Sequence, residues 1–215
     1  MGAVRYKELE GEKARDNRPA NAGDENTRVS GLIGRFVDGD FEAFGELYST
    51  YLDRIYRYVY YQVRDRMLAE DLTEEIFVKA WEAIGKFKPE KLAFSAWLYR
   101  IAHNHVIDYY RTRRQHLQLD EEMPDKGRSL EQELEETLMQ QELSSLLNCL
   151  SPQQRQVIIL KFIEDMDNRQ IAKIMRKSEG AIRVMQMRAL TALREKMGSE
   201  KKICNLNYLK HLANV

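Results

Sequence analysis

The residues best suited to chemistry lie at 94–114, a stretch that reads as one helix with two different faces. One face carries guanidinium groups, an amide and rings three or four residues apart: Arg100, Asn104, Ile107, Arg111 and Arg114, with His103 and Tyr110 beside them. Arginine binds phosphate, rings stack on unpaired bases, and asparagine pairs with a base edge. This pattern favours a helix that faces nucleic acid. An ordinary exposed basic face is the simpler alternative.

The same helix needs a second face that fixes it to a core. Apolar residues at the matching spacing are Phe94, Trp97, Leu98, Ile101, His105 and Tyr109. A loop at 85–92 precedes the helix, because Gly85 can end a helix and Pro89 disfavours one. The loop carries Lys86, Phe87 and Lys88, and we expect it to lie close to the polar face of the helix.

Three further helices are predicted before this loop, at 29–37, 41–64 and 67–84. The third has an inward apolar stripe and an outward acidic ridge, formed by Glu70, Asp71, Glu74 and Glu75. Two explanations of this ridge are equally good. It is either an ordinary solvated surface or a docking surface for a basic partner. Such a surface steers association and fixes register more than it adds affinity.

The second half of the chain predicts a helix-turn-helix. Capping boxes start helices at Ser151 and Asp167, and a short helix is followed by the turn residues Arg176, Lys177 and Ser178. The last helix, 179–197, turns outward Arg183, Val184, Met187 and Arg188. Its N-terminal half would enter a DNA major groove, where arginine reaches phosphate or guanine.

Composition limits the remaining function classes. The 215 residues carry a net charge of +0, but two basic blocks flank an acidic segment at 120–142, which suggests two DNA-facing modules. Two cysteines form no metal spacing or disulfide framework, and no long apolar run or signal peptide is visible. His103 and His105 lie on different helix faces. The sequence therefore predicts a cytoplasmic protein without membrane insertion, catalytic residues, metal or cofactor.

The fold class expected is all-α, with two small helical domains joined by a flexible acidic linker. The expected bounds are a disordered arm at 1–28, a first domain at 29–116, a linker at 117–129, a second domain at 130–198 and a tail at 199–215.

Four blocks, in this order, resemble the extracytoplasmic-function (ECF) sigma factors of bacterial RNA polymerase. They are AEDLTEEIFVKAWEAIGKF at 69–87, FSAWLYRIAHNHVIDYYRTRR at 94–114, LSPQQRQVIILKFIEDM at 150–166 and RQIAKIMRKSEGAIRVMQMRALTALR at 169–194. The resemblance implies that the first domain is sigma region 2, which binds core polymerase and opens the promoter −10 element. It implies that the second domain is sigma region 4, which binds the −35 element as duplex.

The resemblance also implies roles for residues and partners. The acidic ridge would contact the clamp helices of the largest polymerase subunit, and the second domain would contact the flap of the second. Asn104 and the loop around Phe87 would belong to the pocket for a base turned out of the non-template strand. Family members are commonly held inactive by an anti-sigma protein. The chain departs from the family pattern at Glu74, where Gln is common, and at Arg176, where Gly is usual.

Two other function classes are weighed. A stand-alone helix-turn-helix regulator would bind duplex operators without polymerase and would leave the Phe87 loop without a role. An enzyme is disfavoured, because no acid pair or cysteine completes a site with the histidines.

Overall fold

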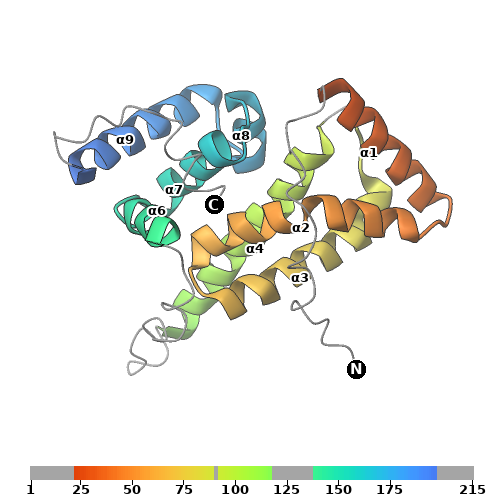
Figure 1. Cartoon of the computed structure of the whole chain (residues 1–215), viewed down its shortest axis with the longest axis horizontal. Coiled ribbons are helices and arrows are strands. Elements are labelled where there is room, and N and C mark those ends of the chain that lie inside the picture. The colour runs from red at the N-terminus through yellow and green to blue at the C-terminus, as the bar shows by residue number, and fades with distance from the viewer. Residues whose placement is uncertain (1–21, 90–91, 118–137, 198–215) are drawn as a thin grey trace.

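The computed structural model describes residues 22–89, 92–117 and 138–197, and every regular element among them is a helix (Figure 1). The all-α prediction is confirmed for this part of the chain. None of its helices is long and apolar enough to cross a membrane. Most of the predicted linker, all of the predicted tail and residues 1–21 of the predicted arm lie outside the described residues.

The first unit consists of four α-helices and one short 3-10 turn: α1 (Ala22–Val37), α2 (Glu42–Val63), α3 (Arg66–Ala83), η2 (Ile84–Lys86) and α4 (Phe94–Leu117). α2 packs on α1, α3 and α4, and α3 also packs on α4. Tyr51, Tyr58 and Tyr99 are among the largest fully buried side chains of the core. These tyrosines, two on α2 and one on α4, therefore serve packing, because a ring buries a large apolar area.

The N-terminal boundary of this unit corrects the expected arm at 1–28. α1 begins at Ala22, so residues 22–28 are helical. In this first part of the helix, Glu25 accepts a hydrogen bond from the Tyr51 hydroxyl at 3.3 Å, which ties α1 to α2. The sequence pattern did not show this, because the buried apolar positions of α1 begin only at Val29.

The second unit consists of α6 (Leu138–Asn148), α7 (Pro152–Ile158), the π-helical turn η3 (Ile159–Ile163), α8 (Asn168–Met175) and α9 (Glu179–Met197). Both predicted capping boxes are present. The side chains of Ser151 and Asp167 accept from the backbone N–H of Gln154 and Gln170, whose side chains accept from the capping residues in return. These local bonds satisfy N–H groups that a helix start leaves unpaired, so they fix where α7 and α8 begin.

The segment between α7 and α8 is not a regular α-helix. After Ile158 the backbone widens into the π turn, and the Glu164 N–H donates to the Ile159 carbonyl at 3.0 Å. Asp165 then adopts a left-handed conformation with φ 55°. Aspartate tolerates this conformation better than most residues. The consequence is a sharp change of direction that turns Glu164 toward the first unit.

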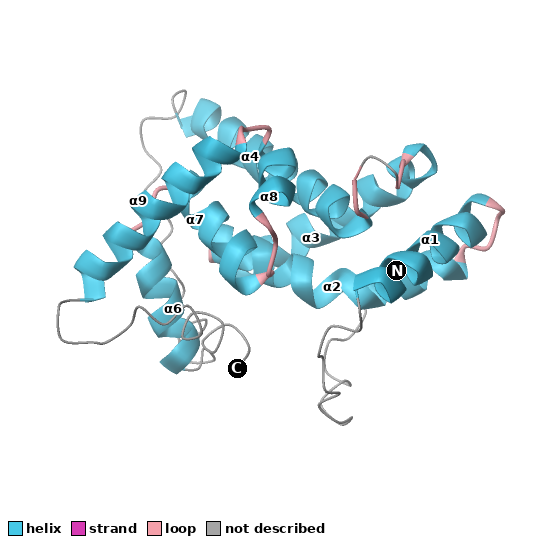
Figure 2. Ribbon diagram, turned by 90° about the horizontal axis from the view of Figure 1, so that it is seen from above, coloured by secondary structure: helices cyan, strands magenta, loops and turns pink. Residues whose placement is uncertain are grey.

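The two units lie directly against each other. α8 packs on α4, and α2 contacts α7 and η3. Figure 1 shows α6 to α9 gathered on one side of the first unit, with α1 on the far side, and Figure 2 shows α8 beside α4 in the second view. The helix-turn-helix therefore rests on the helix that carries the predicted nucleic-acid face.

Candidate nucleic-acid interface

Helix α4 is held from two sides. Its fully buried residues Leu98, Ala102 and Val106 face the core of the first unit, whereas Ile101, His105 and Tyr109 are only half-buried. The inward stripe is thus turned by about one residue relative to the predicted one, which is roughly 100° on a helix. The physical reason is that α2 and α3 bury one side of α4 and α8 buries another.

The predicted polar face of α4 remains partly open. Arg100 and Asn104 are half-buried, Arg111 is exposed, and Ile107 keeps 46 % of its surface. Arg111 forms an exposed ion pair with Asp108 at 3.1 Å, which solvent weakens. Arg114 belongs to α4, but its side chain lies outside the described residues. The structure therefore places amide, guanidinium and apolar groups along one helix face.

The position of His103 differs from the prediction. The sequence pattern places its side chain on the exposed polar face beside Asn104, but only 6 % of its surface is exposed. Burial lowers the pKa of His103 to about 4, and the positive charges of Arg176 and Lys177 act in the same direction, against Gln156, which raises it. The imidazole is therefore neutral at neutral pH. The cause is the packing of α8 and its following turn on α4.

The Phe87 loop lies against the first turn of α4, where its ring contacts residues of the predicted apolar stripe rather than the predicted polar face. The Phe87 ring packs on Phe94, with centroids 5.6 Å apart, and on Trp97 at 5.2 Å. The ring is half-buried, while Lys86 and Lys88 on either side are exposed. The loop thus offers one supported ring surface with a positive charge on each side, which suits a base and its phosphates.

The helix-turn-helix presents its predicted contact residues to solvent. Arg176 ends α8 with φ 53° and ψ 46°, and the Ser178 hydroxyl accepts from the Ala181 N–H at 3.2 Å to cap α9. Along α9 the side chains of Arg183, Val184, Met187 and Arg188 are exposed, and so is Lys177 in the turn. The exposed apolar groups among these arginines suit contact with thymine methyl groups in a major groove.

The acidic ridge is also accessible. Asp71, Glu74 and Glu75 are exposed and Glu70 is half-buried. Glu75 lies 2.8 Å from His105 of α4, so one member of the ridge is shared with the neighbouring helix. On the same helix Val78 and Trp81 keep 58 % and 40 % of their surface. Sequence reasoning overlooked this apolar extension, which a Val and a Trp beside outward acids already indicated.

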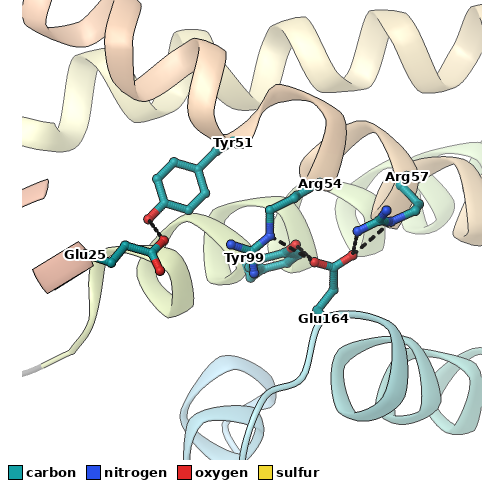
Figure 3. Close-up of polar contacts among 6 residues, drawn as sticks. All are labelled: Glu25, Tyr51, Arg54, Arg57, Tyr99 and Glu164. Atoms are coloured by element: carbon teal, nitrogen blue, oxygen red, sulfur yellow. Dashed lines mark hydrogen bonds and ion pairs between the residues drawn. The ribbon is translucent and has the colours of Figure 1, made fainter. Parts of the chain in front are cut away.

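Glu164 is the residue that the sequence analysis missed most clearly. It lies between two helices of the second unit, yet its side chain is fully buried between the units. Figure 3 shows its carboxylate pointing at Arg54 and Arg57 of α2 and at Tyr99 of α4. An acid directly after an apolar run was the available signal, but its partners lie as far as 110 residues away in the chain.

Comparison with known proteins places both units in one family. Sigma-70 region 2 matches residues 47–116, and Sigma-70 region 4 matches residues 140–193. The chain is 38 % identical to the ECF RNA polymerase sigma factor BldN of Streptomyces coelicolor over 180 residues, covering 82 % of this chain and 68 % of that protein. It is 30 % identical to the ECF sigma factor SigW of Bacillus subtilis, covering 74 % and 91 %.

A solved structure shares the fold. The sigma factor RpoE of Bartonella quintana, solved in complex with the anti-sigma factor NepR, superposes with a TM-score of 0.61 at 24 % identity. The match covers 74 % of this chain and 98 % of that one. With an aromatic-basic helix in one unit, a helix-turn-helix in the other and these relatives, the chain belongs to the ECF sigma factors of bacterial RNA polymerase.

Proposed function

We propose that α4 and the Phe87 loop hold the opened −10 element of a promoter. The residues assigned to this site are Lys86, Phe87, Lys88, Arg100, His103, Asn104, Ile107, Arg111 and Arg114. Asn104 would pair with the edge of a base turned out of the strand, and the lysines would bind phosphates. Stacking contributes ~1–3 kcal/mol per base, comparable with the few kcal/mol that unstacking costs. Binding of the opened strand therefore needs no nucleotide hydrolysis, but its favourable free energy only slightly exceeds the cost of unstacking.

The second contact is the −35 element, bound as duplex by the helix-turn-helix. Arg176, Lys177, Ser178, Arg183, Val184, Met187 and Arg188 are assigned to it. The exposure of these side chains on one edge of α8 and α9 supports the assignment. Val184 and Met187 stand where polar residues are frequent in the family, so we expect an individual −35 preference rather than a general consensus.

The polymerase contact is assigned to Glu70, Asp71, Glu74 and Glu75 of α3, which would meet the clamp helices of the largest subunit. The second domain would meet the flap of the second subunit. An anti-sigma protein, the kind of partner that accompanies RpoE of Bartonella quintana, is the third partner class. The protein would act in the cytoplasm, direct transcription initiation and do no covalent chemistry itself.

The domain bounds that accompany this proposal are those expected from the sequence, 29–116 for region 2 and 130–198 for region 4, with the first domain extended to the start of α1 at Ala22. Linking two DNA-binding modules makes the second contact intramolecular, which raises its effective concentration to the mM range for a short flexible linker. Holding polymerase and the −35 duplex at once thereby stabilises the weakly held −10 strand.

The observation that carries this proposal is the placement of Asn104 and Arg100 on one helix face whose first turn supports the Phe87 ring. The test is core polymerase with promoter DNA, either fully paired or carrying a mismatched bubble at −10. We expect a sequence-selective complex that the bubble strengthens. If this protein adds no selectivity on either template, the proposal is wrong. The family assignment gives no support to the alternative of a stand-alone regulator.

A further inference from the structure

A single buried carboxylate joins the two units. Glu164 Oε2 accepts from Arg54 Nε at 3.2 Å and from the Tyr99 hydroxyl, while Oε1 accepts from Arg57 Nε at 3.3 Å and Nη2 at 3.2 Å (Figure 3). The Glu164 side chain has no exposed surface, whereas Arg54 and Arg57 keep 31 % and 27 % of theirs. Both oxygens of the acid are thus satisfied by the other unit.

The hydrogen bonds of Glu164 to Arg54, Arg57 and Tyr99 exist only while the two units are in contact. A buried carboxylate is very unfavourable unless it is paired and hydrogen-bonded. Here two guanidinium groups, which stay protonated in proteins, provide the counter-charge. Burial raises the pKa of Tyr99, so its hydroxyl keeps its proton and donates it to Glu164. Separating the units would return the Glu164 carboxylate and the two guanidinium groups to water, where charged groups are well solvated.

The backbone conformation around Glu164 directs its side chain toward Arg54, Arg57 and Tyr99. It follows the π turn η3 and precedes Asp165, whose φ is 55°. π turns and left-handed non-glycine residues gather at functional positions, because each needs support from the surrounding structure. The two together place one acid outside the body of the second unit without exposing it to solvent.

Two further hydrogen bonds cross the seam, alongside buried apolar side chains of both units. Gln156 Nε2 donates to the Tyr58 hydroxyl at 3.0 Å, and Arg155 Nη1 donates to the Gln62 carbonyl at 3.2 Å. His103 is buried beneath this seam, and its Nδ1 has no hydrogen-bond partner among the described residues. Hydrogen bonds and ion pairs of this kind are more frequent between domains that separate than in permanent interfaces.

The closed arrangement does not fit a promoter. The two elements are named for positions about 25 base pairs apart, which is roughly 85 Å of B-DNA at about 3.4 Å per base pair. A compact pair of domains of this size measures roughly 40 Å across. In addition, α8 covers part of α4. The units must therefore separate before both elements are bound.

We propose that Glu164 is a latch that holds the free protein closed, with α4 masked by the helix-turn-helix, until the two units are drawn apart. This inference rests on the proposed function for α4, although the closure itself does not. Asp71 and Glu74 remain exposed on α3 in the closed form. Polymerase can therefore dock on the acidic ridge first, and the latch controls the later contact with DNA.

The closure is tested by the distance between the units in solution. One dye is placed on the exposed native Cys149 and another at position 49 through Ser49→Cys, with Cys204→Ser to remove the second thiol. Glu164→Gln leaves Arg54 and Arg57 facing each other without counter-charge. We expect the ratio of closed to open molecules to fall roughly 30-fold or more. The matched control is Glu195→Gln, which removes an exposed carboxylate from the same unit and should leave the distance unchanged.

The masking is tested in the same proteins with a mixed-sequence single-stranded DNA oligonucleotide. Because apparent affinity scales with the open fraction, Glu164→Gln should bind this probe about tenfold more tightly than the wild type or the control variant. Circular dichroism and unfolding of each variant show whether the helices are intact. Arg57→Gln removes a partner from the other side of the seam, so it should open the chain too.

Three outcomes would overturn parts of this account, and they are distinguishable. An unchanged distance in folded Glu164→Gln and Arg57→Gln variants refutes the latch. A wider distance with unchanged DNA affinity refutes the masking. If neither wild type nor variant directs core polymerase to any promoter, the proposed function fails, while the distance measurement still decides whether Glu164 closes the chain.

Discussion

At the scale of single residues, Arg176 combines strain with a predicted DNA contact. It ends α8 in the left-handed conformation, with φ 53° and ψ 46°. A side chain with a Cβ costs ~1–2 kcal/mol there, which glycine avoids. The family usually has glycine at this turn position, which fits the left-handed conformation that the structure shows for Arg176. The retained arginine is consistent with a positive charge being useful where the helix-turn-helix meets DNA.

Arg176→Gly is therefore expected to raise the free energy of unfolding by ~1 kcal/mol, measured by urea denaturation. The same change should weaken −35 duplex binding, because a phosphate contact is lost. Arg176→Ala serves as the control, since it removes the guanidinium but keeps the strain. Equal stability of the Gly and Ala variants would contradict a strained turn.

His103 gives the closed form a pH dependence. Its pKa is lowered to about 4 by burial, from an ordinary value of 6.5, with Arg176 and Lys177 of the second unit facing it and Gln156 opposing the shift. A lowered histidine pKa means that the open form binds more protons, so closure is fully favoured above pH 6.5 and weakens as the pH falls towards 4. By about pH 5 the loss amounts to roughly 2 kcal/mol.

The dye-labelled protein described above should therefore open as the solution is acidified between pH 6.5 and 4. His103→Asn lacks the titrating ring, so its opening should be displaced to lower pH, where the carboxylates titrate. Identical titration curves for the two proteins would show that His103 is not buried by the second unit in solution.

At the scale of elements, α4 and α9 have separate tasks. α4 offers half-buried Asn104 on the helix whose first turn supports the Phe87 ring, and α9 offers exposed Arg188 near its middle. A base-edge contact contributes ~1–3 kcal/mol of discrimination, whereas a phosphate contact acts on all sequences alike. Substitutions in α4 should therefore reduce base discrimination, whereas substitutions in α9 should reduce affinity for duplex DNA.

Asn104→Ala should reduce discrimination at one −10 base by roughly tenfold or more and leave −35 duplex affinity unchanged. Arg188→Ala should weaken −35 binding and leave −10 discrimination intact. Both are measured on the polymerase complex with templates altered at one element at a time. Equal losses at both elements from either change would contradict the assigned roles.

The elements also show what can be predicted from sequence. The starts of α7 and α8 follow from capping residues a few positions away, so Ser151 and Asp167 were sufficient. The burial of His103 and Glu164 depends on partners from a distant part of the chain, and no local pattern contains that information. The face of α4 was misjudged by about one residue for the same reason, because a second unit packs against it.

At the scale of the whole molecule, promoter recognition and self-closure use the same surface. The helix-turn-helix rests on α4, and the acidic ridge on α3 stays open. Under the proposed latch, the protein binds DNA poorly alone and well once polymerase holds its two units apart. Changes of about 1–3 kcal/mol in the contacts around Glu164 would then alter the open population by roughly one to two orders of magnitude.

The central claim is that this protein gives core RNA polymerase the ability to choose promoters. Run-off transcription with purified core polymerase on genomic fragments, followed by mapping of the start sites, tests it most directly. We predict start sites that depend on this protein and share two sequence elements at a constant spacing, one near −10 and one near −35. A set of start sites identical to that of core polymerase alone, under conditions where the protein is folded and bound to polymerase, would contradict the claim.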